Sequence, residues 1–201
     1  MIDENINSQP QHLLLVDDDR IILATLSSGL RHAGYQVSLA DSHDEAVTVL
    51  QSGVRPDLCI LDVQMPEQGG LTLAERLRDF YHLPFIMFSA YSDDETVKKA
   101  SAAGALGYLV KPMDIQQMVP TIEAAMARAR ELETLRVSSV QLQNALQAER
   151  DVNVAVGIVM MQHKVQRDEA FNLLRNAARK RRMKLSELAT ELILAGTILS
   201  L

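Results

Sequence analysis

The first 120 residues alternate between short apolar runs and longer segments in which apolar residues recur with helical periodicity. The runs predict buried strands at residues 12–16, 35–39, 57–61, 84–88 and 107–110. The periodic segments predict helices at residues 20–33, 43–52, 70–80, 93–103 and from 114 onward. This alternation is typical of a parallel sheet covered by helices on both faces. The fold class is therefore α/β, and five strands in this length fit a flavodoxin-like domain.

The pattern changes after Asp114, because no glycine or proline occurs between Pro120 and Gly157. This segment is predicted to form one long linker helix. Its apolar stripe starts at Met118, Ile122, Ala125, Ala129 and Leu132 and continues less regularly through Leu135, Leu142 and Leu146. A stripe that leaves the α/β domain needs an apolar partner, and a dimeric coiled coil supplies one. The alternative is a helix that packs only against its own chain.

The last part of the chain is helical by its pattern. An apolar run at 152–161 is followed by a break at 162–167, by an amphipathic segment in which Phe171 is expected in the core, and by a third segment with Ser186 as a candidate N-cap. The apolar face of this third segment comprises Leu185, Leu188, Ala189, Leu192, Ile193 and Leu194. The predicted organisation is a disordered start at 1–10, the α/β domain at 11–120, the linker helix at 121–146 and a three-helix bundle at 147–201.

Composition and charge limit the setting. No apolar stretch reaches the roughly 18 residues of a membrane span, and the polar start lacks the apolar core of a secretory signal. The single cysteine, Cys59, lies in a predicted strand and is expected to be buried and reduced. We therefore expect a cytoplasmic protein with no membrane partner. Residues 1–121 carry a net charge of −9, whereas residues 161–184 hold 8 basic and 2 acidic residues, which indicates two parts with different partners.

Polar residues follow four of the predicted strands. Asp17 and Asp18 follow the first strand, Asp62 the third, Ser89 the fourth and Lys111 the fifth. The carboxyl ends of parallel strands share one edge of a sheet, so these side chains are expected to converge there. Carboxylates suit Mg²⁺, an aspartate can accept a phosphoryl group, and a lysine can balance the developing charge. Each residue alone is usually a turn residue, a helix cap or a surface charge, but the ordered set indicates a phosphorylation site.

Residues 12–130 resemble a response-regulator receiver domain. The resemblance is carried by Val16-Asp17-Asp18-Asp19, Leu61-Asp62-Val63-Gln64-Met65-Pro66, Phe88-Ser89-Ala90 and Gly107-Tyr108-Leu109-Val110-Lys111-Pro112. It implies that Asp62 is the phosphoacceptor and that a sensor histidine kinase supplies the phosphoryl group. It also implies that Mg²⁺ is bound by the side chains of Asp18 and Asp62 and by the backbone carbonyl of Gln64, and that Asp17 assists, partly through water.

The same resemblance implies a switch. Ser89 would turn toward the phosphoryl group and Tyr108 would follow as the switch aromatic. The alternative is that Tyr108 is a packing residue of the fifth strand. Lys111 would contact the phosphoryl group, and the Lys111–Pro112 peptide is expected to be cis.

The basic residues of the tail predict a polyanion site. Arg175, Arg179, Arg181, Arg182 and Lys184 are the candidates for RNA contact. Some of this charge also suits a helix C-terminus, and any single residue could simply be solvated. Because aromatic residues for base stacking are nearly absent, recognition of the backbone and shape of a folded RNA is favoured over stacking on single strands.

Residues 145–195 resemble the ANTAR domain of transcription antitermination regulators. The resemblance rests on Ala155-Val156-Gly157-Ile158-Val159-Met160-Met161 and Asp168-Glu169-Ala170-Phe171-Asn172-Leu173-Leu174-Arg175. It implies binding of hairpin RNA and antitermination when the receiver is phosphorylated, by a chain that is expected to form a homodimer in that state. Many members have lysine where this chain has Val156, and the usual glycine-rich turn is here Lys164-Val165-Gln166-Arg167.

Two other outputs stay open. The chain could be a phosphorylation-controlled adaptor whose tail binds another protein and no nucleic acid. DNA binding is less favoured because no helix-turn-helix pattern is evident. An enzymatic output is not expected, because the tail has one histidine, no cysteine and no ligand spacing.

Overall fold

The computed structural model describes residues 10–66 and 69–198, and the chain folds into two compact units that divide between Leu132 and Glu133. This division falls inside the predicted linker, while the domain boundaries themselves stay a prediction. Most of the expected disordered start at 1–10 lies outside the described residues. Within the described ranges, no helix combines the length and the apolar character needed to cross a bilayer.

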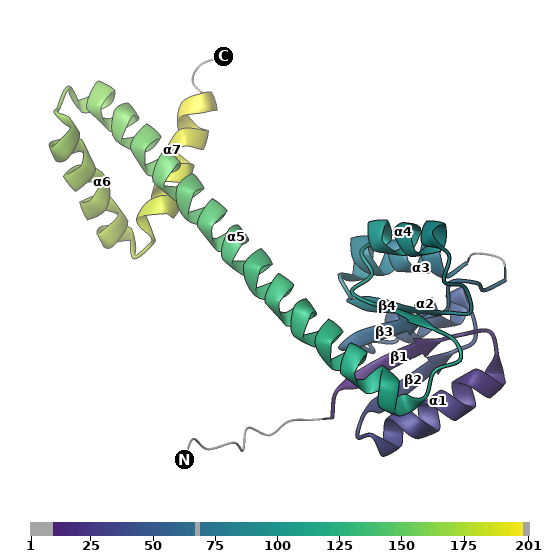
Figure 1. Ribbon diagram of the computed structural model, residues 1–201. Coiled ribbons are helices and arrows are strands. Elements are labelled where there is room, and N and C mark those ends of the chain that lie inside the picture. The colour runs from purple at the N-terminus through teal and green to yellow at the C-terminus, as the bar shows by residue number, and fades with distance from the viewer. Residues whose placement is uncertain (1–9, 67–68, 199–201) are drawn as a thin grey trace. The chain divides into compact units, whose positions relative to one another are not determined.

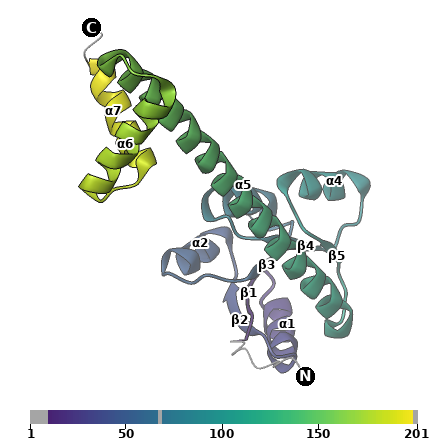
Figure 2. The same ribbon diagram turned by 90° about the vertical axis from the view of Figure 1, so that its left-hand side faces the viewer.

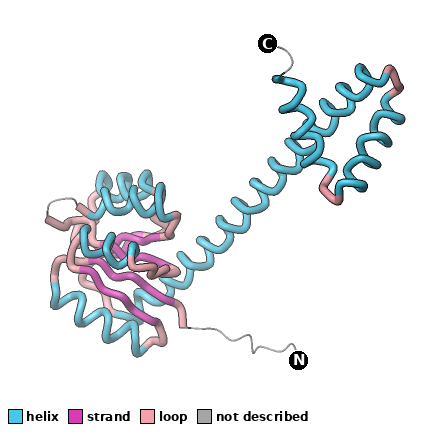
Figure 3. Tube along the Cα trace, turned by 180° about the vertical axis from the view of Figure 1, so that it is seen from behind, coloured by secondary structure: helices cyan, strands magenta, loops and turns pink. Residues whose placement is uncertain are grey.

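The first unit contains a parallel sheet of five strands in the order β2-β1-β3-β4-β5. The strands are drawn as arrows in Figure 1 and in magenta in Figure 3. The strands are β1 His12–Val16, β2 Gln36–Ala40, β3 Leu58–Leu61, β4 Phe85–Ser89 and β5 Tyr108–Val110. All five begin within one residue of their predicted positions, and the predicted flavodoxin-like fold is confirmed. Strands β3 and β4 are buried at every position and β1 is buried from Leu13 to Val16, as expected for strands covered on both faces.

Helices cover both faces of this sheet. They are α1 Arg20–His32, α2 His43–Gln51, α3 Gly70–Arg76, α4 Asp94–Ala103 and the first part of α5 Ile115–His163. Along β1 the side chains alternate: Leu13 and Leu15 pack with α1 and α5, whereas Leu14 and Val16 pack with α2, α3 and α4. The sheet therefore has an apolar core on each face, which explains why its strands are continuous apolar runs in the sequence.

The helix predicted at 70–80 differs in its second half, where Leu77–Tyr81 form a π-helix. The wider turn ends at His82, which has a left-handed φ of 52° and donates its N–H to the carbonyl of Leu77. Pro84 two residues later disfavours helical backbone at Leu83, so the chain must leave the helix here to enter β4.

Helix α5 is continuous over 49 residues, which confirms the long helix expected from the sequence. Its start is fixed to the first unit by the Tyr35 hydroxyl, which donates a 2.6 Å hydrogen bond to Glu123. Met118, Ile122 and Ala125 are buried against the sheet. Farther along, the stripe is 40–63% exposed, at Leu132, Leu135, Leu142 and Leu146. The second half of the stripe therefore has no partner within the described chain.

The second unit consists of the end of α5, α6 Arg167–Arg181 and α7 Leu185–Ile198 (Figure 2). Its core is built largely from small side chains, namely Ala155, Val156, Val159, Ala170, Leu174, Ala178, Leu188 and Ala189. Small residues let three short helices approach closely, so a modest core can hold them together.

Three expectations for this unit were wrong. Phe171 is 38% exposed, because α6 buries Ala170, Leu174 and Ala178 and turns Phe171 to the edge of that face. Leu194 is also exposed. Ser186 is not an N-cap, since α7 begins one residue earlier at Leu185, and the backbone N–H of Lys184 is instead bonded by Glu187.

Candidate functional site

Three carboxylates meet at the carboxyl edge of the sheet. Asp17 and Asp18 follow β1 and Asp62 follows β3, its neighbour, and one oxygen of each lies within 4.8 Å of the others. Asp17 and Asp62 are buried, whereas Asp18 is exposed. Carboxylate oxygens are the hard donors that Mg²⁺ prefers, and two opposite Mg–O bonds span about 4 Å, so a small closing movement of these carboxylates would suit a magnesium ion.

Lys111 reaches the same point from the end of β5. Its Nζ lies 2.5 Å from Asp17 Oδ2 and 2.9 Å from Asp62 Oδ2, and 5.2 Å from the centre of the Phe88 ring. The Lys111–Pro112 peptide is cis, as expected. The ammonium thus bridges the two buried carboxylates and is held over an aromatic face.

The electrostatics of this cluster reflect burial and pairing. Burial raises the pKa of Asp17, and the hydrogen bond from Lys111 offsets this only in part. Burial by itself lowers the pKa of Lys111, but its contacts with Asp17 and Asp62 outweigh that effect and leave the pKa raised. Lys111 is therefore a firmly charged ammonium placed between two acceptors.

Backbone N–H groups orient the aspartates. Asp17 accepts a 3.0 Å hydrogen bond from the N–H of Asp19, and Asp62 accepts one of 3.2 Å from the N–H of Gln64. Asp19 itself is the N-cap of α1 and accepts from the N–H of Ile21. A helix cap was the alternative interpretation of the aspartates after β1, but the cap of α1 is Asp19 and not Asp17 or Asp18.

The first residue of α3, Gly70, lies very close to the backbone of Asp62. A Cβ on Gly70 would lie 1.7 Å from the backbone oxygen of Asp62, far inside van der Waals contact. Only glycine fits at this position without moving the backbone that carries the Asp62 side chain.

We expect Gly70→Ala to destabilise the first unit by roughly 1–3 kcal/mol, since the clash is with backbone rather than with a flexible side chain. The control is Gly157→Ala, because a Cβ there meets nothing within 4 Å and alanine favours the helix. Urea unfolding followed by circular dichroism compares the two. Equal midpoints for Gly70→Ala and wild type would contradict the close approach.

Ser89 and Tyr108 are connected through Tyr91. The buried Ser89 hydroxyl accepts a 3.2 Å hydrogen bond from the N–H of Tyr91, and the Tyr108 hydroxyl donates one of 2.7 Å to the carbonyl of Tyr91. Tyr91 carries no motif that would have singled it out in the sequence. Both candidate switch residues are thus bound to the same peptide segment after β4.

The candidate RNA-contacting residues are all exposed. They lie in the second half of α6 and in the turn after it: Arg175, Arg179, Arg181, Arg182 and Lys184. Arg182 has a left-handed φ of 56° and ends the helix. Arg181 lies 3.3 Å from Glu191 of α7 in an exposed ion pair. The structure therefore leaves this charge available to an external polyanion.

Comparison with known proteins agrees with this geometry. The response regulator receiver domain family matches residues 13–123, and the ANTAR domain family matches residues 140–193. The transcriptional regulatory protein PdtaR of Mycobacterium tuberculosis is 33% identical over 181 residues, covering 90% of this chain and 88% of PdtaR. ZraR of Salmonella typhimurium, also a transcriptional regulatory protein, is 37% identical over 120 residues, covering 59% of this chain and 27% of ZraR.

Solved structures resemble the first unit. The chemotaxis response regulator CheY4 of Vibrio cholerae has a TM-score of 0.55 and 30% identity, covering 58% of this chain and 99% of CheY4. A receiver domain of a diguanylate cyclase from Desulfovibrio desulfuricans has a TM-score of 0.56 and 31% identity, covering 61% and 98%. The sheet order and the acidic edge thus define a receiver domain. The chain belongs to the response regulators and carries a C-terminal ANTAR domain.

Proposed function

We propose that this response regulator is a transcription antiterminator that binds hairpin RNA when Asp62 is phosphorylated. The observation that carries the proposal is the complete set of Asp17, Asp18, Asp62 and Lys111 at one sheet edge, in a chain that ends in an ANTAR domain. The receiver domain supplies the phosphorylation site that controls the protein, and the ANTAR domain supplies the RNA-binding surface. A regulator of this kind would act in the cytoplasm, which agrees with the buried free thiol of Cys59.

In the proposed transfer, a carboxylate oxygen of Asp62 attacks the phosphorus of a phosphohistidine on a sensor histidine kinase. A P–O bond forms as the P–N bond breaks, which leaves an acyl phosphate on Asp62 and a free imidazole on the kinase. The carboxylates of Asp17, Asp18 and Asp62 and the carbonyl of Gln64 are the oxygens that would hold Mg²⁺, whose charge neutralises the phosphoryl oxygens.

Lys111 and Ser89 would stabilise the phosphorylated state. Lys111 already contacts Asp62, so it needs only a small movement to pair with a phosphoryl oxygen. If Ser89 turns to donate to the same group, it gives up the hydrogen bond from Tyr91. Tyr108 is tied to the carbonyl of Tyr91, so a shift of this segment would move Tyr108 with Ser89.

The exposed leucines of α5 are the proposed dimer contact. Their spacing over residues 132–146 suits a coiled coil. The same stripe on α5 of a second chain would bury these exposed leucines. Phosphorylation would favour the receiver state in which two chains associate.

We expect Leu135→Lys with Leu142→Lys to keep the phosphorylated chain monomeric, because two charges would be placed in the apolar seam. The control is Gln141→Lys with Asn144→Lys, which adds the same charge to exposed positions on another side of α5. Sedimentation equilibrium gives the mass of each. A phosphorylated double leucine variant with the dimer mass of wild type would show that the contact lies elsewhere.

The RNA output is tested by sequencing the RNA that co-purifies with phosphorylated wild type, next to Arg175→Ala with Arg179→Ala. Enrichment of hairpins that precede terminators with wild type, and its loss in the variant, is the expected result. A measured affinity for such a hairpin should fall steeply with salt, since each phosphate contact releases a counterion. No affinity for structured RNA at low salt would favour the alternative, an adaptor that binds another protein through the exposed apolar positions of its tail.

A further inference from the structure

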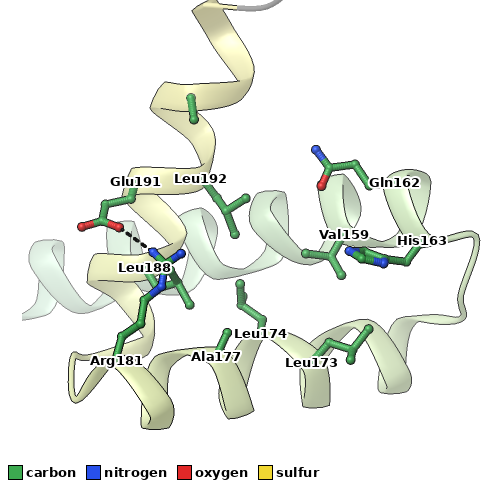
Figure 4. A pocket seen from close by; sticks show the side chains of 11 residues that line it. Val159, Gln162, His163, Leu173, Leu174, Ala177, Arg181, Leu188, Glu191 and Leu192 are labelled. Carbon is green, nitrogen blue, oxygen red and sulfur yellow. Dashed lines mark hydrogen bonds and ion pairs between the residues drawn. The ribbon is translucent and has the colours of Figure 1, made fainter.

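The second unit contains a cavity of about 340 Å³ between the end of α5, α6 and α7 (Figure 4). Its apolar walls are formed by Val159, Leu173, Leu174, Ala177, Leu188 and Leu192. Pockets for small ligands have volumes of roughly 300–1,000 Å³, so the space suffices for a planar ring system. The cavity is open at its rim, where Leu173 is 42% exposed and Ala177 is also exposed.

Polar groups stand at two ends of this cavity (Figure 4). Gln162 and His163, in the last turn of α5, lie at one end. The ion pair between Arg181 and Glu191 lies at the other, with 3.3 Å between nitrogen and oxygen. The amide of Gln162 can both donate and accept a hydrogen bond, so it can read the edge of a ring. Arg181 offers a cation at the opposite end.

The surroundings favour a polyanion over a neutral partner. Residues 161–184, which contain part of the lining, carry 8 basic and 2 acidic residues. An occupant of this cavity therefore has apolar faces, a polar edge and a negatively charged attachment. A nucleotide within an RNA loop has all three, because an unpaired base can leave its stack and enter a pocket while its phosphate stays outside.

We propose that this cavity receives one unpaired base from the loop of the bound RNA hairpin. This rests on the RNA-binding function proposed above and deepens it. The base lies between Leu173 and Leu192, Gln162 hydrogen-bonds its edge, and Arg181 exchanges Glu191 for the adjoining phosphate. Arg175, Arg179 and Arg182 do not line the cavity and contact the RNA backbone alone. The cavity thus adds base recognition to the backbone recognition expected from the sequence.

The test uses the full chain and two RNAs. One is a hairpin selected by wild type from a pool with a randomised loop, and the other is a fully paired duplex with the same stem.

Ala177→Leu places a larger apolar side chain at the exposed rim of the cavity, so it fills the cavity without removing a charge. The matched control is Asn176→Leu, at an exposed neighbouring position of α6 outside the cavity. We expect Ala177→Leu to weaken hairpin binding about tenfold to a hundredfold and to leave duplex binding unchanged. Asn176→Leu should keep both affinities.

A second variant, Gln162→Ala, keeps the proposal testable if Ala177→Leu fails to fold. Repeating the selection with this exposed substitution should change the base preferred at one loop position. Equal hairpin affinity for folded Ala177→Leu and wild type, or an unchanged base preference for Gln162→Ala, overturns the cavity as a base site and leaves RNA binding intact. Loss of self-association by Ala177→Leu with full hairpin affinity would make the cavity a protein contact instead. Failure of wild type to bind either RNA would overturn the proposed function, and this inference with it.

Discussion

We expect Asp62→Asn to abolish phosphorylation of the chain by acetyl phosphate and Mg²⁺. Asparagine keeps the shape of the side chain and can still accept the hydrogen bond from the N–H of Gln64, but its amide cannot form an acyl phosphate. The measurement is phosphate incorporated per chain, together with its release by hydroxylamine, which cleaves acyl phosphates.

The control for this experiment is Asp94→Asn, an exposed carboxylate in the first turn of α4 that lies outside the acidic cluster. It should incorporate as much phosphate as wild type. Full hydroxylamine-labile incorporation by Asp62→Asn would mean that a different residue accepts the phosphoryl group.

The second large effect is expected for Lys111→Met. Lys111 is the cation between Asp17 and Asp62, and removing a preorganised charge that stabilises a transition state lowers a rate by about 10²–10³-fold. Mg²⁺ affinity should not fall, because the substitution removes a positive charge that competes with the ion for the same carboxylates. Phosphorylation kinetics and calorimetric titration with Mg²⁺ separate the two effects.

Lys99→Met is the matched control, since Lys99 forms an exposed ion pair with Glu95 within α4. Both its rate and its Mg²⁺ affinity should equal those of wild type. A Lys111→Met variant that is phosphorylated as fast as wild type would remove Lys111 from the proposed chemistry. One that loses Mg²⁺ affinity would indicate that Lys111 supports the site structurally.

Much of the receiver could be predicted because its strands are buried on both faces. Leu13-Leu14-Leu15-Val16 is apolar at every position, which predicts a strand with both of its faces buried. Polar residues directly after such runs then had to lie at one edge of a parallel sheet. The meeting of Asp17, Asp62 and Lys111 follows from that placement.

The remaining features depend on tertiary contacts that periodicity does not encode. An apolar stripe on α5 predicts that one face of the helix is covered, but it does not say by what. Met118 is buried in the receiver core, whereas Leu142 is exposed and open to an external partner. Phe171 is apolar and next to a buried position, yet the small residues of α6 take the contact with α5 and α7. The cavity of the second unit arises from three helices together and has no signal in any one of them.

The coupling between the two domains is tested most directly by the affinity of the full chain for a hairpin RNA, measured by fluorescence anisotropy with and without acetyl phosphate and Mg²⁺. We expect phosphorylation to tighten binding by wild type about fivefold or more, which is the lower range of coupling between sites, and we expect no response from Asp62→Ala. Identical affinity of wild type and Asp62→Ala under all conditions would contradict phosphorylation control of RNA binding.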